Sequence, residues 1–134
     1  MVTCIASDCR GKWLVTADSG PENILTIWDS QQYFPQKSWF SPHGHVKISK
    51  VAISADAKYL LTLGYHEKAS VYWWIWSFGF DLPHATIEVD VPRDSVIAMG
   101  FNPTNSEQFL LMTKNDIWIG VSAVRLFTNL ASIL

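Results

Sequence analysis

The tripeptide Leu14-Val15-Thr16 returns twice along the chain, as Leu60-Leu61-Thr62 and as Leu111-Met112-Thr113. Each copy follows a polar turn, and each turn follows a short apolar segment. Self-similarity at a fixed period of roughly 20–50 residues is the sequence signature of repeat architectures. The chain of 134 residues is therefore predicted to consist of repeated units.

Two further landmarks repeat at the same spacing as the first two copies. Trp28 and Trp74 lie 46 residues apart, and so do Trp13 and Tyr59. This spacing is close to the period of about 40–45 residues, with four strands in each unit, that is typical of a β-propeller blade. The sequence therefore predicts an all-β fold made of about three four-stranded antiparallel blades.

The strands of these units are predicted from apolar residues at alternate positions, between turns rich in Asp, Asn, Gly and Pro. Pro35 cannot donate to a sheet ladder, so its strand is expected at a sheet edge. The predicted strands around the repeated tripeptides are Val2–Asp8, Ser49–Asp56 and Val96–Pro103 before them, Ile24–Trp28, Ser70–Trp76 and Ile117–Val121 after them, and Tyr33–Phe40 and Ala85–Val91 as fourth strands.

The blades are expected to occupy residues 1–121, with boundaries near 43 and 92 and an incomplete third unit over 93–121. Propellers close a ring with typically about four to eight blades, so three blades are predicted to be part of a larger propeller. Residues 122–134 form an atypical apolar tail. The sequence predicts no strand there, and a short amphipathic helix covering an exposed face is one alternative.

Two dipeptides resemble the WD-repeat family of propellers. Trp28-Asp29 stands where the family's Trp-Asp closes the third strand, and Gly44-His45 resembles the Gly-His that opens a repeat. The third unit departs from the pattern, because Ile119 follows Trp118. The resemblance covers residues 2 to about 121.

The resemblance implies a hydrogen-bonded set that fixes each blade. A His, a Ser or Thr on the second strand, and the Trp form this set in the family, since buried Trp N–H and hydroxyl groups need partners. The residues to which the resemblance gives these blade-structural roles are Thr16, Trp28, Asp29, His45, Thr62, Trp74 and Trp118.

Two longer strings, over residues 13–21 and 101–105, are similar to the propellers of microtubule- and axoneme-associated WD proteins. The resemblance implies a non-enzymatic protein–protein scaffold of the axoneme in motile cilia and flagella, within the cytoskeleton. The implied partners are other axonemal proteins, at the radial-spoke base and in a calmodulin-associated complex. The alternative is a peptide-recognition or substrate-adaptor module outside the cilium, because one fold serves many functions.

Composition and charge exclude several other classes of function. The net charge is −2, and no cluster of Lys and Arg provides the basic stripe that nucleic acids or anionic membranes require. The apolar runs are too short to span a bilayer, and we expect no signal peptide, because the first residues lack a basic start and a continuous apolar run. Cys4 and Cys9 are expected as free thiols of a reducing compartment, and the chain as soluble and cytoplasmic.

No motif in the sequence assembles a catalytic or cofactor site. His43 and His45 have a spacing found in some metal sites, but no further ligands accompany them. The best candidate catalytic residues are Ser70, His66 and Asp56, and no motif brings them together. We therefore expect no enzyme, no metal, no cofactor and no small-molecule substrate.

The most aromatic segment contains Tyr72, Trp73, Trp74 and Trp76. Strand alternation places Trp73 on one face and the other three on the opposite face. Because a blade is enclosed by its neighbours, both faces are predicted to be core, with an exposed interface patch as the alternative. Functional residues of propellers are expected in end loops, for which the candidates are Pro21–Asn23, Phe40–His45 and His66–Lys68.

Overall fold

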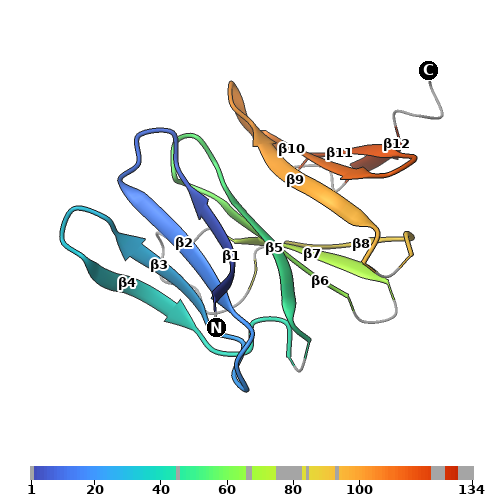
Figure 1. Cartoon of the computed structure of the whole chain (residues 1–134). Coiled ribbons are helices and arrows are strands. Elements are labelled where there is room, and N and C mark those ends of the chain that lie inside the picture. Colours follow the sequence, from blue (N-terminus) through green and yellow to red (C-terminus); the bar gives the residue numbers. More distant parts are fainter. Residues whose placement is uncertain are drawn as a thin grey trace.

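The computed structural model describes residues 2–44, 46–65, 68–74, 83, 85–92, 94–121 and 126–129. Over these residues it contains three four-stranded sheets, in which each strand is antiparallel to the next along the chain (Figure 1). The described residues include no helix long and apolar enough to cross a membrane. The all-β, bladed architecture predicted from the repeat is confirmed.

The three sheets follow one another along the chain. The first comprises β1 (Val2–Ser7), β2 (Trp13–Asp18), β3 (Leu25–Asp29) and β4 (Phe34–Trp39). The second comprises β5 (Ile48–Ile53), β6 (Leu60–Tyr65), β7 (Ala69–Trp74) and β8 (Ala85–Val89). The third comprises β9 (Val96–Asn102), β10 (Asn105–Thr113), β11 (Ile117–Val121) and β12 (Leu126–Asn129).

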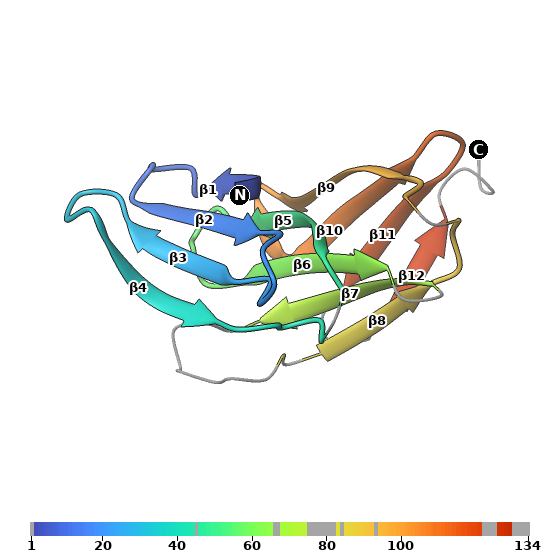
Figure 2. The same cartoon turned by 60° about the horizontal axis from the view of Figure 1, so that its bottom comes forward.

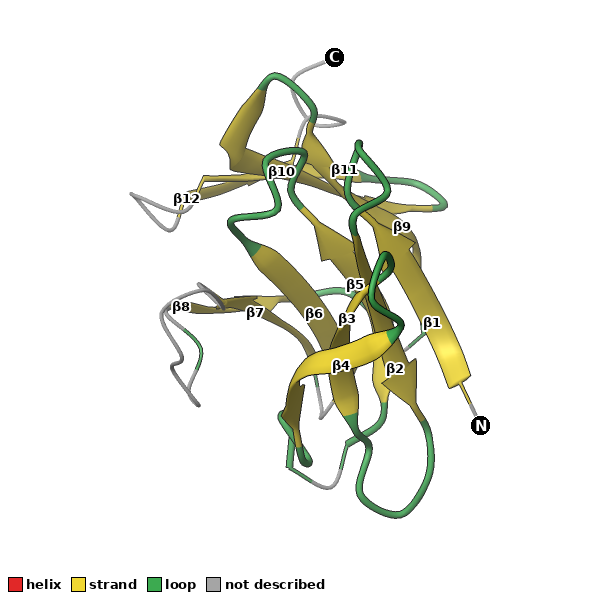
Figure 3. Ribbon diagram, turned by 90° about the vertical axis from the view of Figure 1, so that its left-hand side faces the viewer, coloured by secondary structure: helices red, strands yellow, loops and turns green. Residues whose placement is uncertain are grey.

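The sheets lie side by side, and their first strands are neighbours in space. Contacts join β1 to β5 and β5 to β9, and Figure 2 shows β4, β8 and β12 spread outward from these strands, at the left, the bottom and the right of the view. The side view in Figure 3 shows only strands and loops among the described residues. Pro35 lies on the outermost strand of the first sheet, as its missing N–H predicts.

Tight turns join β1 to β2 and β5 to β6 in a corresponding way. In the first, the Gly11 N–H donates to Asp8 O at 3.1 Å and the Trp13 N–H donates to Asp8 Oδ1 at 3.0 Å. In the second, the Tyr59 N–H donates to Ser54 Oγ at 3.0 Å. Gly11 and Ala57 both have positive φ, of 70° and 61°, which lets the chain reverse within a few residues. The repeat therefore extends to the conformation of its turns.

Two separate apolar cores fill the spaces between the sheets. The core between the first and second sheets contains Val15, Ile27 and Trp74. The core between the second and third sheets contains Trp73 and Phe109. Adjacent residues of β7 therefore enter different cores, each with 1% of its surface exposed. This confirms that Trp73 and Trp74 are core residues on opposite faces; Trp76 lies outside the described residues.

The C-terminal strand differs from the sequence-based expectation. Leu126–Asn129 form β12, which pairs with β11. The pairs run from Val121 opposite Leu126 to Trp118 opposite Asn129. The structure thus has a strand where the sequence predicted none and where a short helix was the alternative. Pairing satisfies the backbone groups of β11 that would otherwise form an open sheet edge. The third sheet consequently has four strands, while the unit boundaries near residues 43 and 92 stay predictions.

Candidate functional site

A hydrogen bond between Thr and Trp recurs in the first two sheets. The Trp28 indole N–H donates to Thr16 Oγ1 at 2.9 Å, and the Trp74 indole N–H donates to Thr62 Oγ1 at 3.0 Å. Each bond links the second strand of its sheet to the third and gives the indole N–H the partner it needs when buried. The structure thus brings together the pairs that the family resemblance implies.

His43 completes the set in the second sheet. Its Nε2 lies 2.7 Å from Thr62 Oγ1, and its ring stacks on Tyr72 with centroids 3.8 Å apart and planes at 7°. The ring is 1% exposed. Gly64 makes room for it, because a Cβ at that position would lie 2.8 Å from His43 Nδ1. The Thr62 hydroxyl therefore contacts both His43, in the connection between the first and second sheets, and Trp74, in the interior of the second sheet.

The resemblance gives this role to His45, and the structure gives it to His43. His45 itself lies outside the described residues. The reason is a turn in which the Gly44 N–H donates to Ser41 O at 2.9 Å, with Gly44 at φ 66°. The order Ser41-Pro42-His43-Gly44 is typical of a β-turn, with Pro at its second position. That order is the sequence signal that could have distinguished the two histidines.

The third sheet keeps the strand register but uses its Thr differently. Trp118 lies opposite Leu111, as Trp28 lies opposite Leu14 in the first sheet. The Thr113 hydroxyl, however, accepts from the Asp116 N–H at 3.0 Å and donates to Asp116 O at 3.4 Å. It therefore caps the short β10–β11 turn. Trp118 packs against the core between the second and third sheets.

Asp29, from the Trp-Asp dipeptide, also has a local structural role. Its Oδ1 accepts from the Gln31 N–H at 2.9 Å and from the Gln32 N–H at 3.3 Å, at the start of the β3–β4 turn. The residue is buried. Such side-chain bonds to the backbone are the usual reason that Asp occupies turns.

A pocket of about 480 Å³ opens at the end of the sheets where β1 and β5 begin. Within it, Tyr65 Oη accepts from the Val96 N–H at 2.9 Å and so links the second sheet to the third. Burial raises the pKa of Tyr65 above its ordinary value; the Val96 N–H opposes this rise and the nearby Asp94 carboxylate adds to it. The lining residues are Thr3, Val46, Lys47, Ile48, Ser49, Tyr65 and Asp94.

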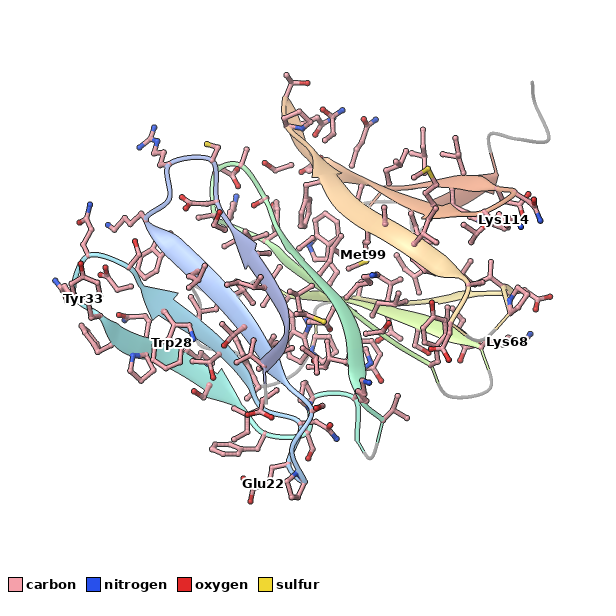
Figure 4. The ribbon with its side chains drawn as sticks, viewed as in Figure 1. Glu22, Trp28, Tyr33, Lys68, Met99 and Lys114 are labelled. Atoms are coloured by element: carbon pink, nitrogen blue, oxygen red, sulfur yellow. The ribbon has the colours of Figure 1, made fainter. Side chains whose placement is uncertain are left out.

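The candidate end loops gather at this same end of the molecule. The β2–β3 turn contains Pro21–Asn23 and is tied to the β4–β5 connection, because the Ser41 N–H and Oγ both donate to Glu22 O, at 2.7 and 2.9 Å. Phe40, beside Ser41, is exposed. Of the third loop only Lys68 is among the described residues; Figure 4 shows it and Glu22 in different end loops.

The arrangement of this end is suited to recognition of polar groups. Lys47 and Asp94 supply opposite charges, and Thr3, Ser49 and Tyr65 supply hydroxyls. Such groups, at the mouth of a rigid scaffold, can bind the main chain and side chains of a peptide. We name these pocket and loop residues together the loop end.

The candidate catalytic residues are not brought together. Ser70 lies opposite Gly64, near the loop end, whereas Asp56 lies in the β5–β6 turn, which precedes the other end of β6. Along β6 the positions of Ser70 and Asp56 are four to five residues apart, which corresponds to roughly 13–17 Å. His66 lies outside the described residues. In the part of the chain that the structure describes, no three His, Cys, Asp or Glu side chains could together hold a metal ion.

Comparison with known proteins supports the same family. No protein-family model matches the chain. Cilia- and flagella-associated protein 251 of Pongo abelii is 34% identical over 117 residues, which make up 86% of this chain and 10% of that protein. The protein of that name from Mus musculus is 30% identical over 115 residues, 84% of this chain and 9% of that protein. The chain thus spans about a tenth of the length of these curated relatives.

Solved structures show the same fold. The β-propeller domain of Cps50 (Swd1) from Myceliophteria thermophila superposes with a TM-score of 0.70 at 18% identity, covering 96% of this chain and 38% of that one. The WD40 repeats of RRP9 superpose with a TM-score of 0.72 at 17% identity, covering 95% and 37%. The bladed architecture, the Thr–Trp bonds and these similarities lead to one conclusion: the chain is part of a WD40-type β-propeller with distant homology to cilia- and flagella-associated protein 251.

Proposed function

We propose that this chain is a non-enzymatic protein–protein interaction scaffold of the motile cilium or flagellum, held in the axoneme. The observation that carries the proposal is the identity of 34% and 30% to two proteins named for cilia and flagella, over more than four-fifths of the chain. The proposed partners are axonemal proteins at the radial-spoke base, including a calmodulin-associated complex.

The loop end supports a binding role for this propeller segment. WD40 propellers are generally non-catalytic binding modules. Here the scaffold is rigid, since two apolar cores and the Tyr65–Val96 hydrogen bond connect the sheets beneath the loops, and the Thr62–Trp74 hydrogen bond joins two strands within the second sheet. A rigid scaffold under exposed loops keeps its binding groups in place and so reduces the entropy lost on binding.

The test is localisation of the tagged full-length protein in a ciliated or flagellated cell, followed by salt extraction of isolated axonemes. We expect the protein to stay with the axoneme after the salt wash. The variant Lys47→Gln, which changes the charge of the loop end, should weaken retention. Gln31→Glu is the matched control, because it makes the same change in net charge at an exposed position of the β3–β4 turn.

A second function, peptide recognition by a substrate adaptor outside the cilium, is favoured by the pocket of the loop end. A cavity of about 480 Å³ is within the usual range for bound ligands, about 300–1,000 Å³. A diffuse or nuclear signal, with protein that washes out freely, would support this function and reject the axonemal one. Retention in salt-washed axonemes would reject the adaptor.

A further inference from the structure

A second pocket lies at the opposite end of the sheets from the loop end. It has a volume of about 490 Å³ and lies between the β1–β2 turn and the β5–β6 turn. The two turns are adjacent, since Cys9 Sγ donates to Ala55 O at 3.1 Å, and Figure 1 shows them side by side. Trp13 and Ala57 give the pocket apolar surface. We call it the turn pocket.

The carboxylates of the turn pocket are already engaged in their own turns. Asp8 is buried, and its Oδ1 accepts from the Trp13 N–H at 3.0 Å. Asp56 accepts from Ser54 Oγ at 2.6 Å and from the Lys58 N–H at 3.1 Å. Asp8 is thereby held against the backbone, whereas Asp56 stays exposed and leaves one negative charge at the rim, against the two positive charges of Arg10 and Lys12.

The cations of the turn pocket are differently placed. Arg10 and Lys12 are exposed, and neither forms an ion pair with any residue that the structure describes. Lys12 Nζ lies 5.1 Å from the centroid of the Trp13 ring. The same pairing recurs in the second sheet, where Lys58 Nζ lies 5.4 Å from the Tyr59 ring. A cation over an aromatic ring keeps its charge, and the stacked stem is held in position.

We infer that the turn pocket binds an acidic peptide segment of a partner protein. A Glu or Asp side chain of the peptide pairs with Arg10 and Lys12, and a neighbouring apolar side chain lies against Trp13 and Ala57. Arg suits carboxylate recognition because its guanidinium donates two parallel hydrogen bonds. Two cations, beside an apolar pocket, are too few for the extended phosphate contacts of a nucleic acid.

This inference goes beyond the proposed function, because it concerns the other end of the sheets and does not require residence in a cilium. The probe is a short fluorescein-labelled peptide in which one Phe is flanked by Glu residues, titrated into the full chain and followed by fluorescence anisotropy. The double variant Arg10→Glu with Lys12→Glu should bind this peptide at least about tenfold more weakly. Lys37→Glu with Lys114→Glu, at positions that line neither pocket, makes the same change in net charge and should have less than about a twofold effect.

A second measurement places the peptide in the turn pocket. Cys9 is exposed and lines it, so alkylation of Cys9 should slow when the Glu peptide is bound and stay unchanged with a peptide carrying Gln for Glu. The inference is overturned if the Gln peptide binds equally well or if both double variants lose affinity alike. It is also overturned if single-stranded DNA or anionic lipid vesicles compete at the same sites more strongly than the peptide, or if wild-type chain does not bind the peptide.

Discussion

The first and second sheets make the same Thr–Trp hydrogen bond in different surroundings. Trp28 is half-buried on the face of the first sheet turned away from the second, while Trp74 is buried between two sheets. Thr16 Oγ1 accepts a hydrogen bond from the Trp28 indole, whereas Thr62 Oγ1 accepts one from the Trp74 indole and also lies at hydrogen-bond distance from His43 Nε2. Figure 4 shows Trp28 within the first sheet, far from the third. The comparison shows that the repeat specifies the hydrogen bond, and that the neighbouring sheets determine how much it contributes to the free energy of unfolding.

Removing each indole should break this comparison most strongly. Trp74→Ala is expected to cost about 3–5 kcal/mol of unfolding free energy, because it empties a closed core site. Trp28→Ala should cost roughly 1–2 kcal/mol, since solvent already reaches that ring. Urea unfolding followed by far-ultraviolet circular dichroism measures both values. Equal losses would show that the packing of the second sheet does not distinguish the two residues.

Changing the shared hydroxyl is the next largest test. Thr62→Val keeps the side-chain shape but removes the hydrogen-bonding partner of Trp74 and of His43, both 1% exposed. We expect a cost of about 2–4 kcal/mol, from two buried polar groups left unsatisfied at about 1–2 kcal/mol each. Thr16→Val is the matched control and should cost about 1 kcal/mol. The same unfolding measurement applies, and a control that loses as much as Thr62→Val contradicts the role given to His43.

The glycines sharpen the comparison at the level of a single methyl group. Gly64→Ala would place a Cβ against the ring of His43, so we expect a loss of about 1–3 kcal/mol from overpacking. Gly100→Ala, on β9, meets nothing within 4 Å and should be neutral or slightly stabilising. Thermal unfolding of the two variants side by side measures the difference. A stable Gly64→Ala variant would mean that His43 does not need its position against β6.

Acid should reveal the smallest effect, in the β5–β6 turn. Burial raises the pKa of Asp56, but hydrogen bonds from Ser54, the Lys58 N–H and Ser106 outweigh it and lower that pKa below its ordinary value. The folded state therefore releases the Asp56 proton more readily than the unfolded state. The resulting stability is present above the unfolded pKa of about 3.9 and is lost as pH falls through the lower folded value.

Asp56→Asn removes this dependence. Its unfolding free energy should fall less steeply than that of the wild type as pH drops below about 4. Glu107→Gln, at an exposed position of β10, serves as the control carboxylate. Parallel curves for Asp56→Asn and the wild type would show that the turn contributes no proton-linked stability.

Local pattern was sufficient for most of the strands, and the family resemblance for the Thr–Trp pairs. Period-two alternation located the strands of the first two sheets within a few residues, but missed β12 of the third; it works because one face of each strand must be apolar to pack on its neighbour. Alternation also predicted that Trp73 and Trp74 enter different cores. The choice of His43 was missed, because the Gly44-His45 dipeptide of the family resemblance was given more weight than the β-turn order that ends at Gly44.

The sequence by itself determined the repeat, the 46-residue spacing of its first two units and most of the strands, because these depend on neighbours along the chain; the family resemblance supplied the blade-fixing Thr and Trp. Only the tertiary structure decided the contacts between sheets. The Tyr65–Val96 bond, the stacking of His43 on Tyr72 and the approach of Cys9 to Ala55 join residues that are distant in sequence. Such contacts depend on how twisted sheets pack face to face, and no local spacing encodes that geometry.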